Sequence, residues 1–538
     1  MRKYLCAGVA LALALAIAGC GGSKSQSSNT ASNSGAGSSK SYAELRWAAL
    51  TFAGPLNILK TIEPQSTSIE QLALQDLVEF EQSGRVKPGV ANSVERPNPT
   101  TYVYHLRPVK FSDGKPLTSA DVVFSLERNL GKEAWTKTYW EDVASVSPRG
   151  GSTVIVKLKR PSAIWEDVLA FTSQILEKAQ VEKIGEKALG TPGNLPIGTG
   201  PWKFDSYQPE VGVQLSRNSY WTGPQQPAAK IDVSLFKTEA SIALALRSGA
   251  IDGTFGYESP KIFANIPGTR PLTAPGTFVT VAGANTTRPP FNDVHVRRAL
   301  AYASDAKGMI SAGYPGGTAV ENASIMSRSL FSNLGSASQV NEMLKTLPQY
   351  HFNLAAAKRE LANSAYPHGF TTTIQVSAIN STWAQDAEIL SSDLAKIGIT
   401  AKVDEIQPDE ETRLTAESSK LATLEVTGFP PVYPDPVAII SSFLAPSQIA
   451  PPGSGLNFAS YRNPEFAKLE SESIETLDPA KRLQLIGKIL KTMAREAPYW
   501  PLYTVDQLGT LSEKYVYPTF SEWTSIFTPW ALDVKLAS

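Results

Sequence analysis

Hydrophobic and polar positions along the body of the chain follow two different periods. Residues 101–106 and 153–158 alternate apolar and polar side chains and are rich in β-branched and aromatic residues, which predicts strands. Elsewhere apolar residues recur three and four positions apart, which predicts helices. The helical stretches are 240–248, 294–303, 354–364, 384–396 and 479–495. Predicted strands and helices follow one another at irregular intervals, which indicates mixed α/β lobes rather than a repeat.

A turn and a helix start lie between the two predicted strands. Residues 111–116 contain Asp-Gly and then Pro, which supply the positive and the fixed φ that a reversal needs. Thr118 can cap the helix that follows, and Asp121 lies near its positive end. Four apolar residues then repeat at helical spacing and are expected to face a core. They are Val122, Val123, Leu126 and Leu130.

Glycines mark further boundaries. Gly249 and Gly398 each follow a predicted helix, where a left-handed residue commonly stops the helix. Residues 197–204 are also glycine-rich, but they lack the third glycine of a dinucleotide fingerprint and the Lys-Ser/Thr of a phosphate loop. We therefore expect a tight turn into a strand there, and no nucleotide site.

The N-terminal segment has the pattern of an export signal. Arg2 and Lys3 precede an apolar run of about thirteen residues, which is too short to span a bilayer. Residues 17–20, Ile-Ala-Gly-Cys, resemble the bacterial lipobox, in which the chain is cut before the cysteine and its thiol is acylated. We expect residues 1–19 to be a signal peptide and Cys20 to carry the lipid anchor. An ordinary secretory signal with an incidental cysteine is the alternative.

A polar segment follows the predicted anchor. Residues 21–41 are rich in Gly, Ser and Asn and contain no large aliphatic side chain before Tyr42, which is typical of a flexible tether. Its reach as a random coil is roughly 25 Å. No later segment contains eighteen uninterrupted apolar residues, so we expect no further membrane span.

Composition narrows the function classes. The 538 residues are too many for one core, and 42% hydrophobic residues support a folded interior of two or three lobes. Fifty basic and fifty acidic side chains balance, which argues against nucleic acid as a partner. Removal of Arg2 and Lys3 with the signal leaves 48 basic and 50 acidic residues, a formal charge of −2.

Few residues are available for metal or thiol chemistry. The two cysteines, Cys6 and Cys20, both lie in the leader, so the body cannot form a disulfide or use a cysteine nucleophile. The four histidines are scattered and form no HExxH motif. We expect neither a metal site nor a cofactor.

Five separated segments resemble one family, the bacterial extracellular solute-binding proteins, family 5, which serve peptide, opine and nickel ABC importers. They are 106–122, with Leu-Arg, Phe-Ser-Asp-Gly and Leu-Thr-Ser-Ala-Asp-Val; 198–221, from Gly-Thr-Gly-Pro to Asn-Ser-Tyr-Trp; 297–303; 395–399; and 433–436, Tyr-Pro-Asp-Pro. In this order along the chain, the five segments extend over nearly the whole body of the sequence.

This resemblance implies the fold of a periplasmic binding protein. Two α/β lobes with hinge crossovers and an inserted third domain would close over a ligand. Lobe I would comprise 42–80, 196–285 and 506–538. The inserted domain would span 81–195 and lobe II 286–505, after the lipidated Cys and tether at 20–41.

The resemblance also implies candidate contacts with the ligand. In peptide-binding relatives the loop after a Leu-Asp-Pro-like turn and a strand of lobe two pair with the ligand backbone. Residues 62–64, Ile-Glu-Pro, look like that turn, which makes Gln65, Ser66 and Thr67 candidates. The strand would be 427–429, which adds Thr427, Gly428 and Phe429. An ordinary loop and a core strand are the alternative for each.

One position departs from the peptide binders. Their strand leads, four residues after its glycine, to an aspartate that pairs with the ligand's amino group, whereas this chain has Val432 there. A peptide amine would need another partner, for which Asp435 is a candidate beside Tyr433. Modified peptides and opine- or sugar-like solutes stay open.

Three aromatic residues of the inserted domain could form ligand-contacting walls. Trp135, Tyr139 and Trp140 offer faces that accept variable side chains without strict hydrogen bonding. The alternative is that at least two of them belong to the core.

The expected protein is a monomeric, membrane-tethered binder outside the cytoplasm that passes a peptide or small solute to ABC permease subunits, and not an enzyme. An extracellular hydrolase is the alternative from another class, although the sequence has no Gly-x-Ser-x-Gly elbow. An adhesive lipoprotein and a binder of chelated metal are further alternatives.

Overall fold

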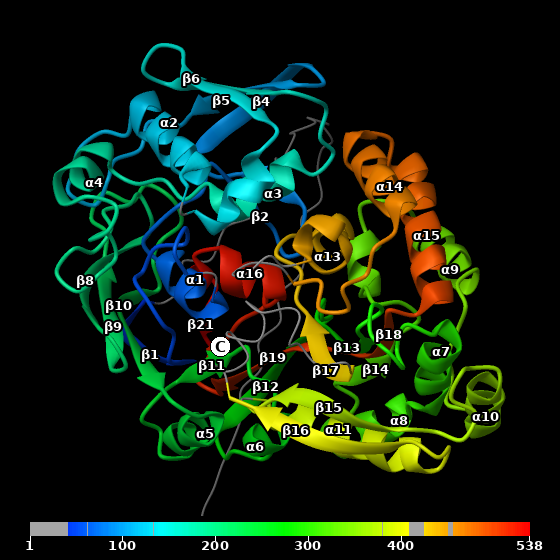
Figure 1. The fold of residues 1–538 in the computed structure, drawn as a ribbon. Coiled ribbons are helices and arrows are strands. Elements are labelled where there is room, and N and C mark those ends of the chain that lie inside the picture. Colours follow the sequence, from blue (N-terminus) through cyan, green and yellow to red (C-terminus); the bar gives the residue numbers. More distant parts are fainter. Residues whose placement is uncertain (1–40, 62, 133, 379, 408–423, 450–455) are drawn as a thin grey trace, which may run out of the picture. The chain divides into compact units, whose positions relative to one another are not determined.

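Two mixed sheets and one antiparallel sheet organise the chain (Figure 1). A computed structural model describes residues 41–61, 63–132, 134–378, 380–407, 424–449 and 456–538. The predicted signal peptide, Cys20 and most of the tether lie outside these residues, as does Ile62 of the predicted turn.

The first sheet has seven strands in the order β12-β19-β11-β1-β10-β9-β8. Their bounds are β1 Tyr42–Leu50, β8 Trp202–Gln208, β9 Gly212–Arg217, β10 Ala228–Phe236, β11 Gly253–Phe255, β12 Thr269–Ala274 and β19 Gln507–Ser512. Strand β1 runs parallel to both of its neighbours, β10 and β11. The sheet therefore joins segments that lie hundreds of residues apart in sequence.

The second sheet has six strands in the order β14-β18-β13-β17-β15-β16. Their bounds are β13 Val279–Ala284, β14 Ala319–Glu321, β15 Thr371–Ser377, β16 Thr400–Ile406, β17 Leu424–Phe429 and β18 Tyr499–Val505. Helix α11, Ser381–Ala395, packs on β15, β16 and β17.

Smaller sheets complete the strand content of the described residues. A four-stranded antiparallel sheet, β4-β5-β7-β6, contains β4 Ala91–Asn98, β5 Thr101–Leu106, β6 Val143–Pro148 and β7 Thr153–Leu158. Two further pairs are β2 Val78–Phe80 with β3 Val86–Pro88, and β20 Tyr515–Val516 with β21 Lys535–Leu536.

Helices connect and cover these sheets. Up to the second sheet they are α1 Pro64–Glu70, α2 Ser119–Glu127, η1 Arg128–Leu130, η2 Trp135–Trp140, α3 Trp165–Thr172, α4 Lys178–Ile184, α5 Glu239–Arg247 and α6 Pro260–Phe263. Beyond it they are α7 Val294–Ala303, α8 Ala306–Gly313, η3 Arg328–Phe331, α9 Ala337–Lys345, α10 Leu354–Ala362, α11 Ser381–Ala395, α13 Val437–Ile439, η5 Ile440–Leu444, η6 Pro446–Gln448, α14 Pro464–Glu475, α15 Pro479–Glu496, α16 Glu522–Phe527 and η7 Trp530–Leu532.

The structure confirms the strands and helices predicted from periodicity, with ends shifted by a few residues at most. Asp121 accepts hydrogen bonds from the backbone N–H and the hydroxyl of Thr118, which fixes the start of α2. Gly249 and Gly398 have φ of +69° and +93°, as helix stops require.

One core prediction is wrong. Val122 and Leu126 are buried, but Leu130 is 41% exposed. The α-helix ends at Glu127 and the chain continues as the 3₁₀ turn η1. Because a 3₁₀ turn has three residues per turn, the α-helical spacing no longer brings Leu130 onto the buried face.

Two chain crossovers join the main sheets. The chain passes from β12 to β13 through residues 275–278, and from β18 to β19 through Asp506. The crossovers touch at Gly276, where an added Cβ would lie 1.6 Å from the carbonyl oxygen of Val505. The carbonyl of Gly276 also accepts a hydrogen bond of 2.7 Å from Ser327. Only glycine fits this contact.

The predicted domain boundaries stay a prediction. The seven-stranded sheet draws its strands from 42–50, 202–274 and 507–512, and the four-stranded sheet lies wholly within 81–195. Strand β13 lies within the range 196–285 that the resemblance assigns to lobe I, and it pairs with β17 and β18 of the six-stranded sheet.

We predict that Gly276→Ala lowers the free energy of unfolding by about 2–4 kcal/mol, because the new methyl group collides with backbone that cannot rotate away. Gly151→Ala is the matched control: a Cβ there meets nothing within 4 Å. Its effect should stay within about 0.5 kcal/mol. Urea denaturation measures both, and equal stability of the two variants would contradict the steric account.

Candidate functional site

A cavity of about 320 Å³ lies where the two crossovers meet. Its walls come from α1, from β1 and β11 of the seven-stranded sheet, from both crossovers and from α16. Pro430, directly after β17 of the six-stranded sheet, also lines it. We call this space the cleft cavity. Helices α1 and α16 pack on each other beside it (Figure 1).

Aromatic rings form much of its wall. Trp47 and Trp530 pack with ring centroids 4.6 Å apart, and Phe255 meets Trp530 edge-on at 5.2 Å. The N–H of Trp530 donates to the carbonyl of Ser68 in α1, which ties this wall to the helix. Phe278, from the first crossover, stacks on Trp383 with centroids 6.0 Å apart. Such faces suit apolar portions of a solute.

All of the charged side chains that line the cleft cavity are acidic. Glu258, Asp506 and Glu522 line it, whereas its lining, all of it within the described residues, includes no Lys, Arg or His. Glu258 is exposed to solvent at the cavity, and desolvation by the atoms around its carboxylate raises its pKa to about 7, with a smaller contribution from Glu239. Burial raises the pKa of Glu522 to about 7. Burial also raises the pKa of Asp506. A positive group entering the cavity would favour the ionised carboxylates.

Hydrogen bonds hold two of these carboxylates in place. The amide of Asn380, at the start of α11, donates to Oε2 of Glu258. The backbone N–H and the hydroxyl of Thr277 in the first crossover both donate to Oε2 of Glu522. Each carboxylate is therefore positioned by an element from another part of the chain.

The residues predicted after the Ile-Glu-Pro turn lie in a helix rather than a loop. Pro64 starts α1, and the N–H of Thr67 already donates to the carbonyl of Glu63 at 3.2 Å. Ser66 and Thr67 are buried, and both hydroxyls donate to that same carbonyl. Gln65 lines the cleft cavity. The N–H of Thr67 is thereby engaged within α1, and pairing of a ligand backbone with 65–67 stays a prediction.

The predicted strand 427–429 is the end of β17. It pairs with β13 over its whole length, whereas its pairing with β15 covers only Leu424 and Glu425. Gly428 lies against the Phe278–Trp383 stack, since an added Cβ would be 2.0 Å from Phe278. Phe429 is buried and stacks on Phe443 with ring centroids 4.1 Å apart.

The other predicted residues gather elsewhere. Trp135, Tyr139 and Tyr433 line a second cavity of about 660 Å³. Trp140 is fully buried and donates to the hydroxyl of Thr172, which makes it a core residue. Asp435 is buried in an ion pair with Arg482, with both N–O distances 2.9 Å. Its carboxylate is therefore already matched by a cation.

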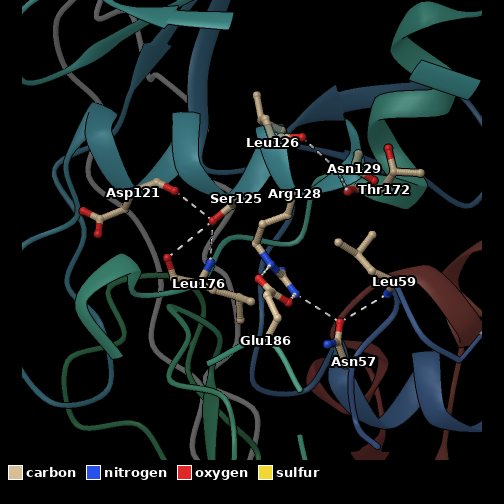
Figure 2. A network of polar contacts seen from close by, with 10 residues as sticks. All are labelled: Asn57, Leu59, Asp121, Ser125, Leu126, Arg128, Asn129, Thr172, Leu176 and Glu186. Carbon is tan, nitrogen blue, oxygen red and sulfur yellow. Dashed lines mark hydrogen bonds and ion pairs between the residues drawn. The ribbon is translucent and has the colours of Figure 1, made fainter. Parts of the chain in front are cut away.

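A polar network links η1 to the loop before α1 and to α3 (Figure 2). Arg128 pairs with Glu186 through two N–O contacts of 2.5 and 3.0 Å, and it also donates to the side chain of Asn57. That same Asn57 oxygen accepts the N–H of Leu59 in the loop before α1. Asn129 donates to the carbonyls of Leu126 and Thr172, which holds η1 against α3.

The carboxylates and Phe278 were missed by sequence reasoning. Glu258 lies in a loop, and Glu522 is one more acidic residue at a helix start. No local motif marks either residue. Only the folded chain shows that they converge, from positions 264 residues apart, on one cavity.

Comparison with known proteins places the chain in a family. The sequence profile of the bacterial extracellular solute-binding proteins, family 5 Middle, matches residues 85–451. The chain belongs to this solute-binding family. Family 5 membership confirms the resemblance found in the sequence, and the family consists of binding proteins rather than enzymes.

Family 5 relatives cover most of the chain. Heme-binding protein A of Haemophilus influenzae is 27% identical over 86% of this chain and 88% of its own. Glutathione-binding protein GsiB of Escherichia coli is 24% identical over 77% and 79%. The periplasmic binding protein DppA of Helicobacter pylori, solved with the peptide STSA, matches with a TM-score of 0.77 at 22% identity over 92% of this chain and 98% of its own. This last likeness confirms the predicted binding-protein fold.

The described part of this family 5 protein contains no cluster of three or more His, Cys, Asp or Glu side chains arranged to hold a metal ion. Within the same residues, no helix has both the length and the hydropathy to cross a bilayer.

We predict that Arg128→Ala lowers the free energy of unfolding by about 1–3 kcal/mol, because it removes three hydrogen bonds from a side chain that is only 7% exposed. Lys178→Ala breaks an exposed pair with Glu182 and serves as the control, with an effect within about 0.5 kcal/mol. Thermal unfolding compares the two. A loss no larger than that of the control would contradict a fastening role.

Proposed function

We propose that this protein is the substrate-binding component of an ABC importer and captures a peptide or peptide-like solute in the cleft cavity without catalysing a reaction. The observation that carries the proposal is the position of the cavity. Both crossovers between the main sheets line it, together with elements of each sheet. A solute held there would contact both sides and favour their closed arrangement by its differential contacts.

The free edge of β17 supports a peptide-like ligand. Because the pairing with β15 ends at Glu425, residues 426–429 have β13 as their strand partner on one side only. An extended ligand backbone can add to such an edge. This would give Thr427, Gly428 and Phe429 their predicted main-chain role, and Pro430 then leads directly into the cleft cavity.

The cavity carboxylates supply a partner for the ligand's amino group. Val432 lacks the charge that peptide-binding relatives place at this position, and Asp435 is held by Arg482. Glu258, Asp506 and Glu522 instead offer negative charge inside the cavity, where no basic lining residue competes. The favoured solutes therefore carry an ammonium or another cationic group.

Non-peptide solutes are the second candidate. Relatives include proteins named for heme and glutathione, and one solved structure of similar fold contains agropinic acid. The aromatic walls of the cleft cavity would accept an apolar portion of such a solute. Hydrolysis of a bound peptide by the pure protein would instead support the alternative of an extracellular hydrolase.

The setting proposed for this binder follows from its sequence. Cleavage before Cys20 and its acylation would tether the body outside the cytoplasm, at the periplasmic face if an outer membrane is present. The Gly/Ser-rich segment would let a monomeric body approach ABC permease subunits at the same membrane. Growth of a deletion strain on peptides, with and without the Cys20→Ala variant, tests this part.

We predict that binding of trialanine, as a probe with a free amine, tightens as pH rises from about 5.5 to about 7, a range in which its amine stays protonated. Glu258 and Glu522 have pKa values of about 7 in the free protein, so a cation must displace their protons at low pH. The expected gain is about tenfold. Calorimetric titration across this range measures it, and affinity that falls or stays constant would contradict the proposal.

We predict that Glu258→Gln weakens trialanine binding by about tenfold and flattens its pH dependence, because one of the cavity's negative charges is removed. Glu513→Gln, on the exposed surface, is the control and should leave affinity unchanged. N-acetylated trialanine should bind weakly to all three proteins. Equal binding of the free and acetylated peptides would contradict recognition of the amine.

A further inference from the structure

A third cavity, of about 350 Å³, lies on the other face of the seven-stranded sheet from the cleft cavity. Phe255 of β11 lines the cleft cavity and is paired with Gly509 of β19. Leu508 and Thr510, on either side of Gly509, line the third cavity instead. Because successive side chains of a strand point to opposite faces, the sheet lies between the two spaces. We call the third one the hinge cavity.

Both main sheets contribute to the walls of the hinge cavity. Helix α6, the residues just after it and strands β12 and β19 form the seven-stranded side. Pro315 and Thr318 come from the segment that leads into β14 of the six-stranded sheet. The carbonyl of Thr318 accepts the N–H of Asp506 in the second crossover at 2.9 Å. Lys261 of α6 also donates to the carbonyl of Ala312 in α8, so the two sides are in direct contact beside the cavity.

A fixed pair of aromatic rings forms one wall. Tyr257 and Phe263 stack with ring centroids 3.9 Å apart. The hydroxyl of Tyr257 lies 3.1 Å from the carbonyl of Gly509 and 3.0 Å from the hydroxyl of Thr510, which holds the ring against β19. Rigid apolar surfaces of this kind suit an aromatic ligand. Three prolines complete the apolar lining, Pro260, Pro271 and Pro315.

The hinge cavity differs from the cleft cavity in its charge. Its lining residues, all of them described by the structure, include no Asp, Glu, Lys, Arg or His, whereas three carboxylates line the cleft cavity. A charged ligand in the hinge cavity would lose its hydration without gaining an ion partner, which is unfavourable. The hinge cavity is therefore suited to neutral molecules.

One hydroxyl on the wall of the hinge cavity lacks a partner. Oγ1 of Thr318 is buried and makes no hydrogen bond with any described residue. The hydroxyl of Thr510, by contrast, is engaged with Tyr257. A buried hydroxyl without a partner is unfavourable, so a ligand with one group that donates or accepts a hydrogen bond would be stabilised beside Thr318.

Rotation of the two sheets about the crossovers would change the width of the hinge cavity. When the walls of the cleft cavity approach each other, the walls on the opposite face of the hinge separate. Opening of the cleft would instead move Pro315 and Thr318 toward α6 and β12 and narrow the hinge cavity. A molecule lodged in the hinge cavity would therefore oppose opening and favour the closed arrangement.

We propose that the hinge cavity binds a neutral two-ring aromatic molecule with one hydrogen-bonding group, and that this ligand favours closure of the cleft around the solute. Its rings would pack on Tyr257 and Phe263, and its polar group would bond the hydroxyl of Thr318. A cavity of roughly 150 Å³ holds one benzene ring, so the volume of about 350 Å³ accommodates two fused rings. The effect on solute capture rests on the function proposed above, whereas the site itself does not.

The first test is calorimetric titration of the purified protein with indole, a neutral two-ring molecule with one N–H. Indole should bind, and indole-3-acetate, which adds a carboxylate, should bind about tenfold more weakly. Ala264→Trp fills the hinge cavity and should abolish indole binding. Two control variants should leave it unchanged: Ala355→Trp on the exposed surface of α10, and Gln65→Trp in the cleft cavity.

The hydroxyl of Thr318 is tested separately. Thr318→Val removes only the unpartnered hydroxyl, so it should weaken indole binding roughly 3- to 10-fold while thermal unfolding stays as in the parent chain. The site is overturned if indole does not bind, if indole-3-acetate binds equally well, if Ala264→Trp and Ala355→Trp bind indole equally, or if Gln65→Trp loses it. Unchanged binding by Thr318→Val overturns the proposed hydrogen bond.

The second test measures closure itself. Saturating indole should lower the radius of gyration of the solute-free protein in small-angle X-ray scattering, and it should tighten trialanine binding about 3- to 10-fold. An unchanged radius, or an unchanged affinity for trialanine, overturns the coupling between the two cavities. If trialanine does not bind while indole still binds and compacts the protein, the choice of solute in the proposed function fails and the hinge site stands.

Discussion

The contact between the two crossovers at Gly276 is the constraint on which the binding site depends. The backbone of residue 276 lies directly against the carbonyl of Val505, and no side chain larger than hydrogen fits between them. The crossovers thereby place Phe278, Asp506 and Gln507 around one space. Strands of both main sheets begin or end within a few residues of this contact. A change in its geometry would therefore displace strands in each sheet.

Electrostatics sets the character of the site that results. Three carboxylates share a cavity with aromatic walls, and two of them have pKa values raised by desolvation to about 7. Without a solute, partial protonation of the buried Glu522 relieves the cost of burying its negative charge, whereas Glu258 is exposed. With a cationic solute, the same carboxylates would ionise and pair with it. The site is therefore suited to bind a positive charge, which none of its own lining residues supplies.

Local sequence patterns were sufficient for the elements but not for the site. Periodicity located β5, β7 and α7 because each buries one face, and Thr118 and Asp121 marked the start of α2 through hydrogen bonds between neighbours in sequence. Resemblance to family 5 gave the class of protein.

Long-range contacts decided what sequence reasoning missed. Glu258 and Glu522 come together in one cavity only when β11, α16 and the crossovers pack in the folded chain. No motif in the sequence around either residue predicts this. The loop expected at 65–67 is helical because Pro64 starts α1 and the carbonyl of Glu63 accepts the first bonds of its turn. Leu130 is exposed because a 3₁₀ turn follows α2, a change of pitch that hydrophobic spacing does not reveal.

Native mass spectrometry of the protein purified without denaturation tests the central claim, that the cleft cavity holds the solute. The account predicts a bound small molecule with a cationic group, released on unfolding and lost from a Gln65→Trp variant whose indole fills the cavity. A parent protein without bound solute, or a variant that retains the same molecule at the same occupancy, would contradict it.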